Sequence, residues 1–378
     1  MSKKIRLIVN AIPATYVNTG IARYLRCLYA EMEKLYGDRL DIGYFDGKTV
    51  SRILPLGPAN PGQWSRMTEL FWRLPAPAAL LIRLAFHAIQ EFRFYRLSQN
   101  FHLYHEAAYF PFKTTSHLKR VLTIHDLSLI RFPQYHPRER VLYTKLFLKN
   151  RCKRVDHFLA VSDFTNKEMQ THLGTTPDKS TVTPLAYNHA IFYPRSPSRV
   201  EEHLSANHLP SRYFLFVGSG DPRKNMDSIP AALAHAGVDI PLVVVGWAGW
   251  AKNTRSATIH FVGYVTDEEL AHIYSGALAL VFPSTYEGFG LPILEAMACG
   301  CPVITTTQAS LPEVAGNAAV YVDDPGDKEN FGNTLKKVAE DDLLRKEMRQ
   351  KGLCRAQEFS WQRTAEITMS VFEKILAE

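Results

Sequence analysis

The sequence has 378 residues, 46% of them hydrophobic and 21% charged, which is typical of a globular protein and excludes a disordered chain. Its five cysteines form no Cys-x-x-Cys pair, which excludes a disulfide scaffold and a zinc ribbon and fits a reducing compartment. At about 150 residues per domain, two domains are the simpler expectation. The opening apolar run, residues 5–9, is too short for an export signal or a membrane span, so we expect a cytoplasmic protein.

The two halves of the chain differ in charge. Residues 1–200 carry 29 Lys and Arg against 14 Asp and Glu, a balance of +15, whereas residues 201–378 carry 15 against 23, a balance of −8. A basic half joined to an acidic half predicts that one domain meets an anionic partner. Nucleic acid, an anionic membrane and a phosphorylated substrate are all open alternatives on this observation alone.

Short apolar runs alternate with helical patterns along the whole chain. In the first half, residues 5–9, 121–124 and 158–161 predict strands, and residues 20–36 predict a helix. In the second half the predicted strands are residues 213–217, 242–245, 259–262, 277–282 and 302–305. Near-continuous apolar strands separated by helices indicate parallel sheets covered on both faces. We therefore expect an α/β protein built from two doubly wound domains.

The domain boundary is predicted near residues 188–211, where residues 188–198 are turn-rich and the charge balance also changes sign. This gives a first domain of residues 1–190 and a second of residues 191–360. The last segment, residues 360–377, has the pattern of a single amphipathic helix that begins at Ser360.

Residues 64–97 depart from the strand–helix alternation. They hold five Arg and two Glu among many aromatic and aliphatic side chains. Cationic amphipathic helices of this kind can lie in a membrane interface. An ordinary core helix with arginines extending from its edges fits equally well, and the sequence does not separate the two.

The strongest motif spans residues 284–298, STYEGFGLPILEAMA, between a predicted strand and a predicted helix. Its glycines allow close backbone approach to a ligand, and Pro292 suits the first helical position. A helix that opens directly after a strand presents N–H groups and a positive dipole end, which favours phosphate. We expect Glu287 in the loop and Glu295 in the first helical turn. Carboxylates beside a phosphate would repel it unless they contact hydroxyls, such as those of a sugar or ribose.

This motif resembles the E-x7-E element of the GT4 retaining glycosyltransferases, which have a GT-B fold. The resemblance implies two facing Rossmann-like domains with a C-terminal helix, residues 361–378, that crosses back to the first. It extends over most of the chain. Further similar segments are the glycine loop at residues 19–24, the strand ending in His-Asp at 121–127, the VSDFT segment at 160–165 and the basic motif at 216–225.

In such enzymes the first glutamate of the pair contacts the transferred sugar and the second contacts the ribose of the nucleotide. The resemblance therefore assigns these roles to Glu287 and Glu295, and the backbone of Phe289, Gly290 and Leu291 to the sugar and pyrophosphate. Arg223 and Lys224 are expected to neutralise the departing diphosphate. That last role also follows from chemistry, because breaking a sugar–phosphate bond develops negative charge that fixed cations stabilise.

In the first domain, His125 comes at the end of a predicted buried strand. A lone histidine there is more often structural, but the family places a histidine at this point against the donor sugar. The resemblance implies that His125 bonds a sugar hydroxyl or helps to orient the acceptor. Asp126, which follows it, and Gly20 and Arg23 of the glycine loop are expected to bind substrate.

The sequence also departs from the family pattern. Many relatives have an arginine where this chain has Ser219-Gly220, which leaves Arg223 to carry that charge or weakens diphosphate binding. Ala22 replaces a common second glycine. The chain contains no Asp-x-Asp, so neither a metal-bridged diphosphate nor any other cofactor is expected, and it contains no P-loop.

Together these features predict a retaining, metal-independent hexosyltransferase. The preferred reaction moves mannose from GDP-mannose to a hydroxyl of a lipid-linked or lipopolysaccharide oligosaccharide, with the donor on the second domain and the acceptor on the first. Peripheral contact with an anionic membrane, at its inner face, remains an open alternative. A GT-B sugar-nucleotide epimerase would share the site but need no acceptor. A basic nucleic-acid-binding protein would leave the motifs of the second domain unexplained, so no nucleic-acid partner is expected.

Overall fold

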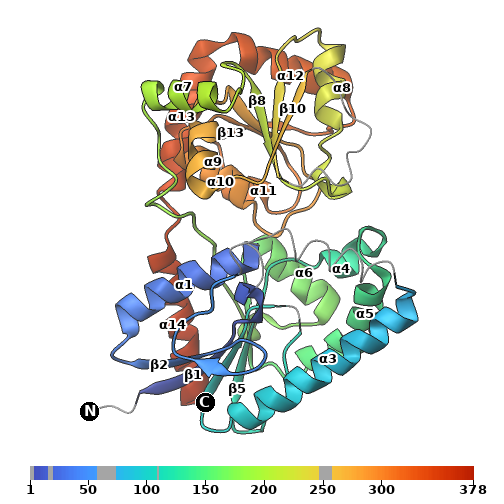
Figure 1. Cartoon of the computed structure of the whole chain (residues 1–378), viewed down its shortest axis with the longest axis vertical. Helices are drawn as coiled ribbons and strands as arrows, with labels where there is room; N and C mark the ends of the chain where they lie inside the picture. Colours follow the sequence, from blue (N-terminus) through green and yellow to red (C-terminus); the bar gives the residue numbers. More distant parts are fainter. Residues whose placement is uncertain (1–3, 16–19, 58–73, 109, 247–257) are drawn as a thin grey trace. The chain divides into compact units, whose positions relative to one another are not determined.

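The computed structural model describes residues 4–15, 20–57, 74–108, 110–246 and 258–378 (Figure 1). The chain divides into two units by its backbone contacts. The first unit comprises Met1–Leu185 and Trp361–Glu378, and the second comprises Ala186–Ser360. The units thus divide after Leu185, whereas the sequence analysis placed the boundary at residue 190.

In its described residues, the first unit contains a seven-stranded sheet with the order β3-β2-β1-β4-β5-β6-β7. Each neighbouring pair is parallel except β2 and β3, which are antiparallel. The central strands are buried nearly throughout because helices cover both faces. The strands are β1 (Ile5–Asn10), β2 (Leu40–Phe45), β3 (Val50–Ser51), β4 (Leu103–Glu106), β5 (Lys119–Ile124), β6 (His157–Ala160) and β7 (Ser180–Val182).

The helices of the first unit include one from the far end of the chain. The C-terminal helix α14 (Trp361–Ala377) packs against α1 and strands β5 and β6, which confirms that the chain returns to its first domain. The others are η1 (Ile12–Thr15), α1 (Gly20–Tyr36), α3 (Ala76–Leu97), α4 (Ser128–Arg131), η2 (Pro133–Tyr135), α5 (Arg138–Cys152), α6 (Asp163–Leu173) and η3 (Pro177–Lys179).

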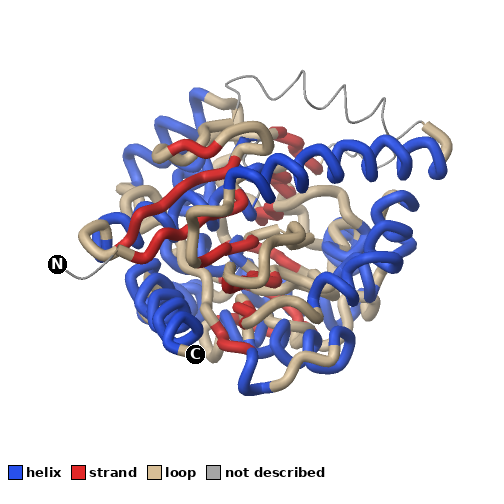
Figure 2. The backbone as a smooth tube through the Cα atoms, turned by 90° about the horizontal axis from the view of Figure 1, so that it is seen from below, coloured by secondary structure: helices blue, strands red, loops and turns tan. Residues whose placement is uncertain are grey.

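The second unit contains, in the residues described, a six-stranded sheet with the order β10-β9-β8-β11-β12-β13, and every pair is parallel. Its strands are β8 (Phe214–Val217), β9 (Leu242–Val245), β10 (Ile259–Gly263), β11 (Ala279–Phe282), β12 (Val303–Thr306) and β13 (Ala319–Val322). Its helices are α7 (Pro197–Ala206), η4 (Pro222–Lys224), α8 (Ser228–His235), α9 (Asp267–Gly276), α10 (Leu291–Ala298), α11 (Leu311–Ala315), α12 (Lys328–Glu340) and α13 (Asp342–Ala356). Figure 2 shows strands with helices around them.

Local sequence signals explain where individual helices start and stop. Helix α6 begins after Ser162, whose hydroxyl accepts a 3.0 Å hydrogen bond from the N–H of Thr165, and it ends at Gly174 in the left-handed conformation. Helix α9 opens with a capping box in which Thr266 and Glu269 satisfy each other's backbone N–H. The two N-terminal caps fix where each helix starts, a few residues after the strand that precedes it.

In both sheets the order in which the chain adds strands reverses at one point, the switch point. This point locates the part of each sheet where a ligand would bind. The chain winds outward from β1 to β3 and then returns to start at β4 on the other side of β1. In the second unit the same reversal separates β8 from β11. Ligands of doubly wound sheets bind outside the carboxyl ends of the strands at this switch point. The loops after β1, β4, β8 and β11 are therefore the places to search for a site.

Candidate functional site

The loop after β8 is a tight basic turn. It enters the short helix η4 at Asp221, which accepts a 2.9 Å hydrogen bond from the N–H of Arg223. The guanidinium of Arg223 donates two hydrogen bonds to the same carboxylate, from Nε to Oδ1 at 3.1 Å and from Nη2 to Oδ2 at 2.6 Å. Burial alone would raise the pKa of Asp221, but these hydrogen bonds and the charge of Arg223 hold that pKa below its usual value. Arg223 is thus positioned by an ionised partner two residues away.

Lys224 connects this turn to the loop after β11. Its Nζ lies 2.6 Å from Oε1 of Glu287, and both side chains are mostly buried, with 21% and 17% exposed. The Ser284 hydroxyl lies 2.8 Å from the same oxygen, and the ring of Phe282 lies 5.0 Å from Nζ. Because both charges are largely removed from water, loss of either partner would leave the other unpaired at a substantial cost.

The two loops are also joined through the carbonyl oxygen of Arg223. That oxygen accepts from the N–H of Thr285 at 2.8 Å and from the Thr285 hydroxyl at 3.1 Å. The Ser284 hydroxyl lies 3.2 Å from it, so this hydroxyl has two possible acceptors, the carbonyl oxygen of Arg223 and the carboxylate of Glu287. The position of the cations therefore depends on the loop that carries the glutamate.

Two glycines, which the sequence analysis did not single out, make this geometry sterically feasible. A Cβ on Gly218 would lie 2.8 Å from Cδ of Lys224, so glycine lets the lysine stem pass the end of β8. Gly246 follows β9 with φ +126°, and a Cβ there would lie 2.2 Å from the carbonyl oxygen of Gly218. The available signal was a glycine directly after each of two neighbouring apolar strands.

Helix α10 begins where the loop after β11 ends. Gly290 precedes it with φ +106°, and Pro292 occupies its second position, not the first as the sequence analysis expected. The Ser310 hydroxyl lies 2.9 Å from the carbonyl oxygens of both Glu287 and Phe289, which fixes the approach to the helix. The first N–H groups of a helix have no partner within it and carry partial positive charge. This end of α10 therefore suits an anion beside Lys224.

Glu295 does not lie where the sequence analysis expected it. Because α10 starts at Leu291, this residue falls in the second turn, and it is only 2% exposed. The Tyr274 hydroxyl on α9 donates to its Oε2 at 3.4 Å. The expectation of a first-turn carboxylate is therefore wrong, and ribose contact stays a prediction. Phe289 is buried too, with its ring against Phe359, so its backbone is the part suited to a ligand.

The switch point of the first unit contains a carboxyl group that the sequence analysis missed. Glu106, at the end of β4, is completely buried. It accepts from Nδ2 of Asn10 at 2.9 Å to each oxygen, from the N–H of Ala108 at 2.7 Å and from the Tyr104 hydroxyl. Burial raises its pKa to about 7, although these donors oppose the shift. The polar residues at the end of β4 interrupt its apolar pattern, so this strand was not predicted.

His125 comes directly after β5, as expected. Its Nε2 lies 3.2 Å from the carbonyl oxygen of Ala107, which can only accept, so we infer that Nε2 carries the proton and Nδ1 has a lone pair. Burial lowers the pKa of His125 to about 4 despite the nearby Asp126 charge. The ring of Tyr24 meets it edge-on at 4.9 Å. The imidazole is therefore neutral near pH 7 and offers an acceptor at Nδ1.

The other residues predicted for the site in the first unit lie at or next to the starts of helices. Asp126 accepts a 2.8 Å hydrogen bond from the N–H of Ser128, which begins α4. Gly20 is the exposed first residue of α1, and Arg23 lies half-buried in its first turn. Residues 16–19, part of the expected glycine loop, lie outside the described residues. Substrate binding by these three residues stays a prediction.

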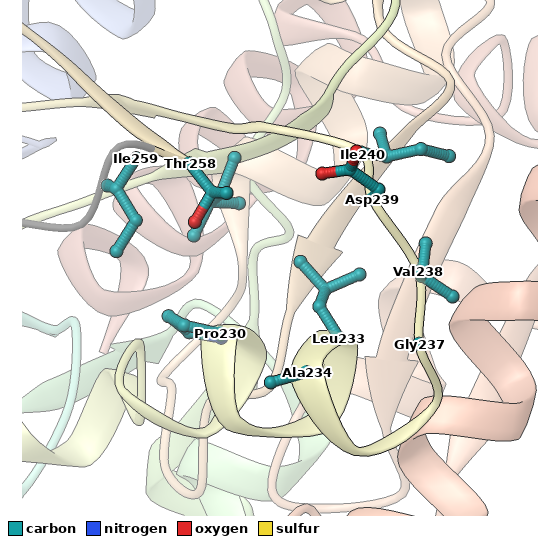
Figure 3. A pocket seen from close by; sticks show the side chains of 10 residues that line it. Pro230, Leu233, Ala234, Gly237, Val238, Asp239, Ile240, Thr258 and Ile259 are labelled. Carbon is teal, nitrogen blue, oxygen red and sulfur yellow. The ribbon is translucent and has the colours of Figure 1, made fainter.

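A cavity elsewhere in the second unit does not belong to this site. It has a volume of about 320 Å³ and lies between α8 and the amino ends of β9 and β10, the opposite ends of those strands (Figure 3). Mostly apolar side chains line it, including Leu233, Val238 and Ile240. None of the predicted site residues contributes to its lining.

Comparisons with known proteins agree with the fold and the motif positions. Residues 19–191 match the family model for Glycosyltransferase Family 4, and residues 201–353 match that for Glycosyl transferases group 1. The chain is 35% identical to O-antigen chain mannosyltransferase B of Escherichia coli over 269 residues, covering 68% of this chain and 70% of that protein. It is 26% identical to the E. coli serotype-specific mannosyltransferase WbdA over 68% of this chain but spans only 34% of that longer protein.

A solved structure shares the fold at low sequence identity. The Anabaena protein HepE, crystallised with UDP-glucose, superposes with a TM-score of 0.70 at 15% identity, covering 98% of this chain and all of that one. That likeness establishes the fold. With the family matches and the relative that it covers by 70%, the chain belongs to the GT4 family of glycosyltransferases and has their GT-B fold of two Rossmann-like domains.

Proposed function

We propose that this glycosyltransferase moves mannose from GDP-mannose to a hydroxyl of an oligosaccharide acceptor of surface-polysaccharide assembly, with retention at the anomeric carbon and without a metal. The observation that carries the proposal is the Lys224–Glu287 pair at the switch point of the second unit. It sets a cation for phosphate beside a carboxylate for sugar hydroxyls. The choice of mannose is supported by the names of the relatives, which are mannosyltransferases.

The proposed donor site holds the diphosphate between η4 and the start of α10. Both cations are paired, Arg223 with Asp221 and Lys224 with Glu287. A lysine ammonium has three donors, so Lys224 can keep its carboxylate and also reach a phosphate oxygen. Cations that are already fixed in place stabilise the charge of the leaving group without reorganising during the reaction.

Glu287 is suited to hold the transferred sugar. Its Oε1 accepts from Lys224 and Ser284, whereas among the described residues no donor reaches Oε2. That oxygen can accept a hydrogen bond from a hydroxyl of the hexose. A carboxylate already neutralised by a lysine would not repel the diphosphate next to it.

In the proposed reaction the acceptor oxygen bonds to C1 of the mannose. The bond from C1 to the β-phosphate oxygen breaks, and its electron pair leaves with GDP. The acceptor proton passes to that same phosphate oxygen, so attack and departure occur on one face and the configuration is retained. A carboxylate nucleophile from the first unit is a poor alternative, because Glu106 is completely buried and both its oxygens are occupied.

We propose that the first unit binds the acceptor. The neutral His125 would accept a hydrogen bond at Nδ1 from a sugar hydroxyl and so orient it. Its depressed pKa of about 4 keeps it in the form that can accept throughout the physiological range.

A donor panel tests the proposal. Thermal unfolding is measured with GDP-mannose and with UDP-, ADP- and dTDP-sugars, since a ligand that binds only the folded state raises its melting temperature. We expect the largest shift with GDP-mannose, slow hydrolysis of that donor alone, and transfer once an oligosaccharide acceptor is added. The anomeric configuration of the product is read by NMR, and transfer should persist in EDTA. A new sugar nucleotide formed from donor alone would instead indicate an epimerase, and stabilisation by another sugar nucleotide would overturn the choice of donor.

A further inference from the structure

The positive charge of the first unit is not concentrated at its switch point. The groups there are Asn10 and Glu106, with His125 after the next strand, and all three are buried or half-buried. Burial shifts the pKa of Glu106 and that of His125 toward their neutral forms. Residues 1–200, most of which belong to the first unit, have a charge balance of +15, so most of this charge lies elsewhere. Part of it lies on one face of α5, where four of the exposed basic side chains follow one another at spacings of seven, four and four residues. We call them the α5 cations: Arg138, Lys145, Lys149 and Lys153, the last directly after the helix.

Helix α3, which lies beside α5 in Figure 1, has an exposed face that is mainly apolar. Three of its largest side chains, Leu81, Phe86 and Phe92, are 68%, 64% and 63% exposed. Arg93 and Arg96 lie on the same face. Arg93 donates from Nη1 to the carbonyl oxygen of Gly47 at 3.4 Å, and Arg96 stacks over the ring of Phe92. The α3 face, as we call it, comprises Leu81, Ile82, Phe86, Ile89, Phe92, Arg93, Tyr95, Arg96 and Leu97.

The opposite side of α3 fixes the helix to the unit. Phe94 is completely buried, and its ring meets Phe45 at 5.2 Å. Ion pairs tie α3 to α5, Arg83 with Glu139 at 3.2 Å and Glu91 with Arg151. A surface helix normally has one apolar face, and α3 has apolar residues on both. A contiguous exposed apolar patch marks a surface that meets a partner.

We propose that the α3 face docks the enzyme onto an anionic lipid bilayer, with α3 lying in the plane of the interface. The aliphatic and aromatic side chains would enter the boundary between headgroups and acyl chains, and Arg93 and Arg96 would extend to the phosphates. The neighbouring α5 cations add attraction to an anionic surface. Charge favours this occupant, because among the described residues of α3 and α5 every exposed charged side chain is basic, which suits an anionic surface.

The inference goes beyond the proposed function and rests on it in one respect, that its oligosaccharide acceptor is the lipid-linked one expected from the sequence. An enzyme held at the bilayer would meet such an acceptor at high local concentration. Docking itself needs neither donor nor acceptor, so its test is independent of the transfer reaction.

The test is sedimentation of the full chain with vesicles, without substrates. We expect binding to vesicles of phosphatidylcholine mixed with phosphatidylglycerol, weaker binding to phosphatidylcholine alone, and loss of the difference at high salt. The triple variant Leu81→Ser, Phe86→Ser, Phe92→Ser should bind at least about tenfold more weakly, because the buried apolar area sets the affinity of an interfacial helix. Leu343→Ser, at a leucine 77% exposed in the second unit, is the matched control and should bind like the parent.

A second variant pair tests the charges. Replacing Arg93 and Arg96 by Gln should weaken binding to anionic vesicles about fivefold for each arginine, with a small effect on neutral vesicles. The matched control replaces the exposed Lys336 and Lys337 of α12 by Gln and should bind as the parent does. Thermal unfolding checks that each variant is folded, as expected for exposed positions.

Two outcomes would overturn the proposal. Equal sedimentation of the triple variant and its parent would show that the α3 face does not contact lipid. A concentration-dependent dimer that the triple variant dissociates, together with vesicle binding that the variant leaves unchanged, would assign the face to a second copy of the chain.

Discussion

The two units share a strand order but differ at their switch points. In the second unit the loops after β8 and β11 hold ionised pairs, Arg223 with Asp221 and Lys224 with Glu287, all partly exposed. In the first unit the end of β4 holds a completely buried carboxyl, Glu106, and the loop after the next strand, β5, holds a half-buried imidazole, His125. Burial shifts the pKa of each group toward its neutral form. The topology fixes where a ligand binds, and the burial of the side chains decides whether charge or neutral hydrogen bonding is available there.

The comparison also separates the net charge of a unit from the charge of its site. The acidic half of the chain, with a balance of −8, fixes two cations at its switch point, where we propose that a diphosphate binds. The basic half, at +15, instead has a buried carboxyl and an imidazole whose pKa values shift toward their neutral forms. Charge at a site must be local and fixed to act on a reaction. The excess positive charge of the first unit is partly on its outer helices, where it can act on a large anionic surface.

The largest effect is expected from removing the carboxylate of Glu287 from the charged site of the second unit. Glu287→Ala removes the carboxylate that we propose binds the sugar, and it leaves Lys224 without its partner. We expect turnover to fall by about 10²–10³-fold, the range seen for loss of one transition-state contact, with a smaller change in stability. Transfer rates and thermal unfolding are measured together, and Glu329→Ala on the exposed start of α12 is the control. Full activity of Glu287→Ala with a competent donor would exclude the residue from the site.

The next effect concerns the cation. Lys224→Met keeps the length of the side chain and removes its charge, so GDP should bind about 10–100-fold more weakly, as for loss of a charge-assisted contact in a part-buried site. Calorimetric titration with GDP measures the affinity. A double-mutant cycle with Glu287→Gln separates phosphate binding from the ion pair. Unchanged GDP affinity in Lys224→Met would reduce the lysine to a structural partner of Glu287.

A smaller effect tests the glycines that make room for the lysine. In Gly218→Ala the new Cβ meets the flexible stem of Lys224 at 2.8 Å, so the ammonium should shift, with GDP affinity falling more than stability. In Gly246→Ala the new Cβ meets backbone at 2.2 Å and the φ is positive, so stability should fall by at least about 1 kcal/mol. Denaturant unfolding and GDP titration of both variants give the comparison. Equal stability losses would show that Lys224 does not take up the strain at Gly218.

The sequence predicted most of the second unit because its apolar strands are continuous and its motifs local. The strand over 242–245 matches the structure residue for residue, and so does the helix over residues 20–36 in the first unit. Contacts between distant segments were beyond reach, since nothing local brings Lys224 to Glu287, 63 residues away. Glu295 was misplaced because one turn holds about 3.6 residues and the start of α10 was uncertain. In the first unit, polar residues interrupt the apolar pattern of β4, so neither this strand nor Glu106 was predicted.

The smallest effect on donor turnover is expected from substitution of Glu106. This residue tests the first unit's switch point through the pH dependence of the protein's stability. Its folded pKa of about 7 lies above the usual value of 4.5, so its contribution is fully present below pH 4.5 and is lost as the pH rises through 7. The depressed pKa of His125 acts the other way, and its contribution is lost as the pH falls from 6.5 toward 4.

Glu106→Gln removes the contribution of Glu106 to the pH dependence of stability and leaves the contribution of His125. Relative to the variant, the parent should therefore lose stability between pH 5 and 8, by no more than about 3 kcal/mol for a pKa shift of this size. Urea unfolding at several pH values measures this difference, and Glu329→Gln at an exposed position should give a flat one. A difference between parent and Glu106→Gln that does not vary with pH would mean that Glu106 stays ionised at its buried position. In that case Asn10, Tyr104 and Ala108 would hold an anion there, and the first switch point would be charged like the second.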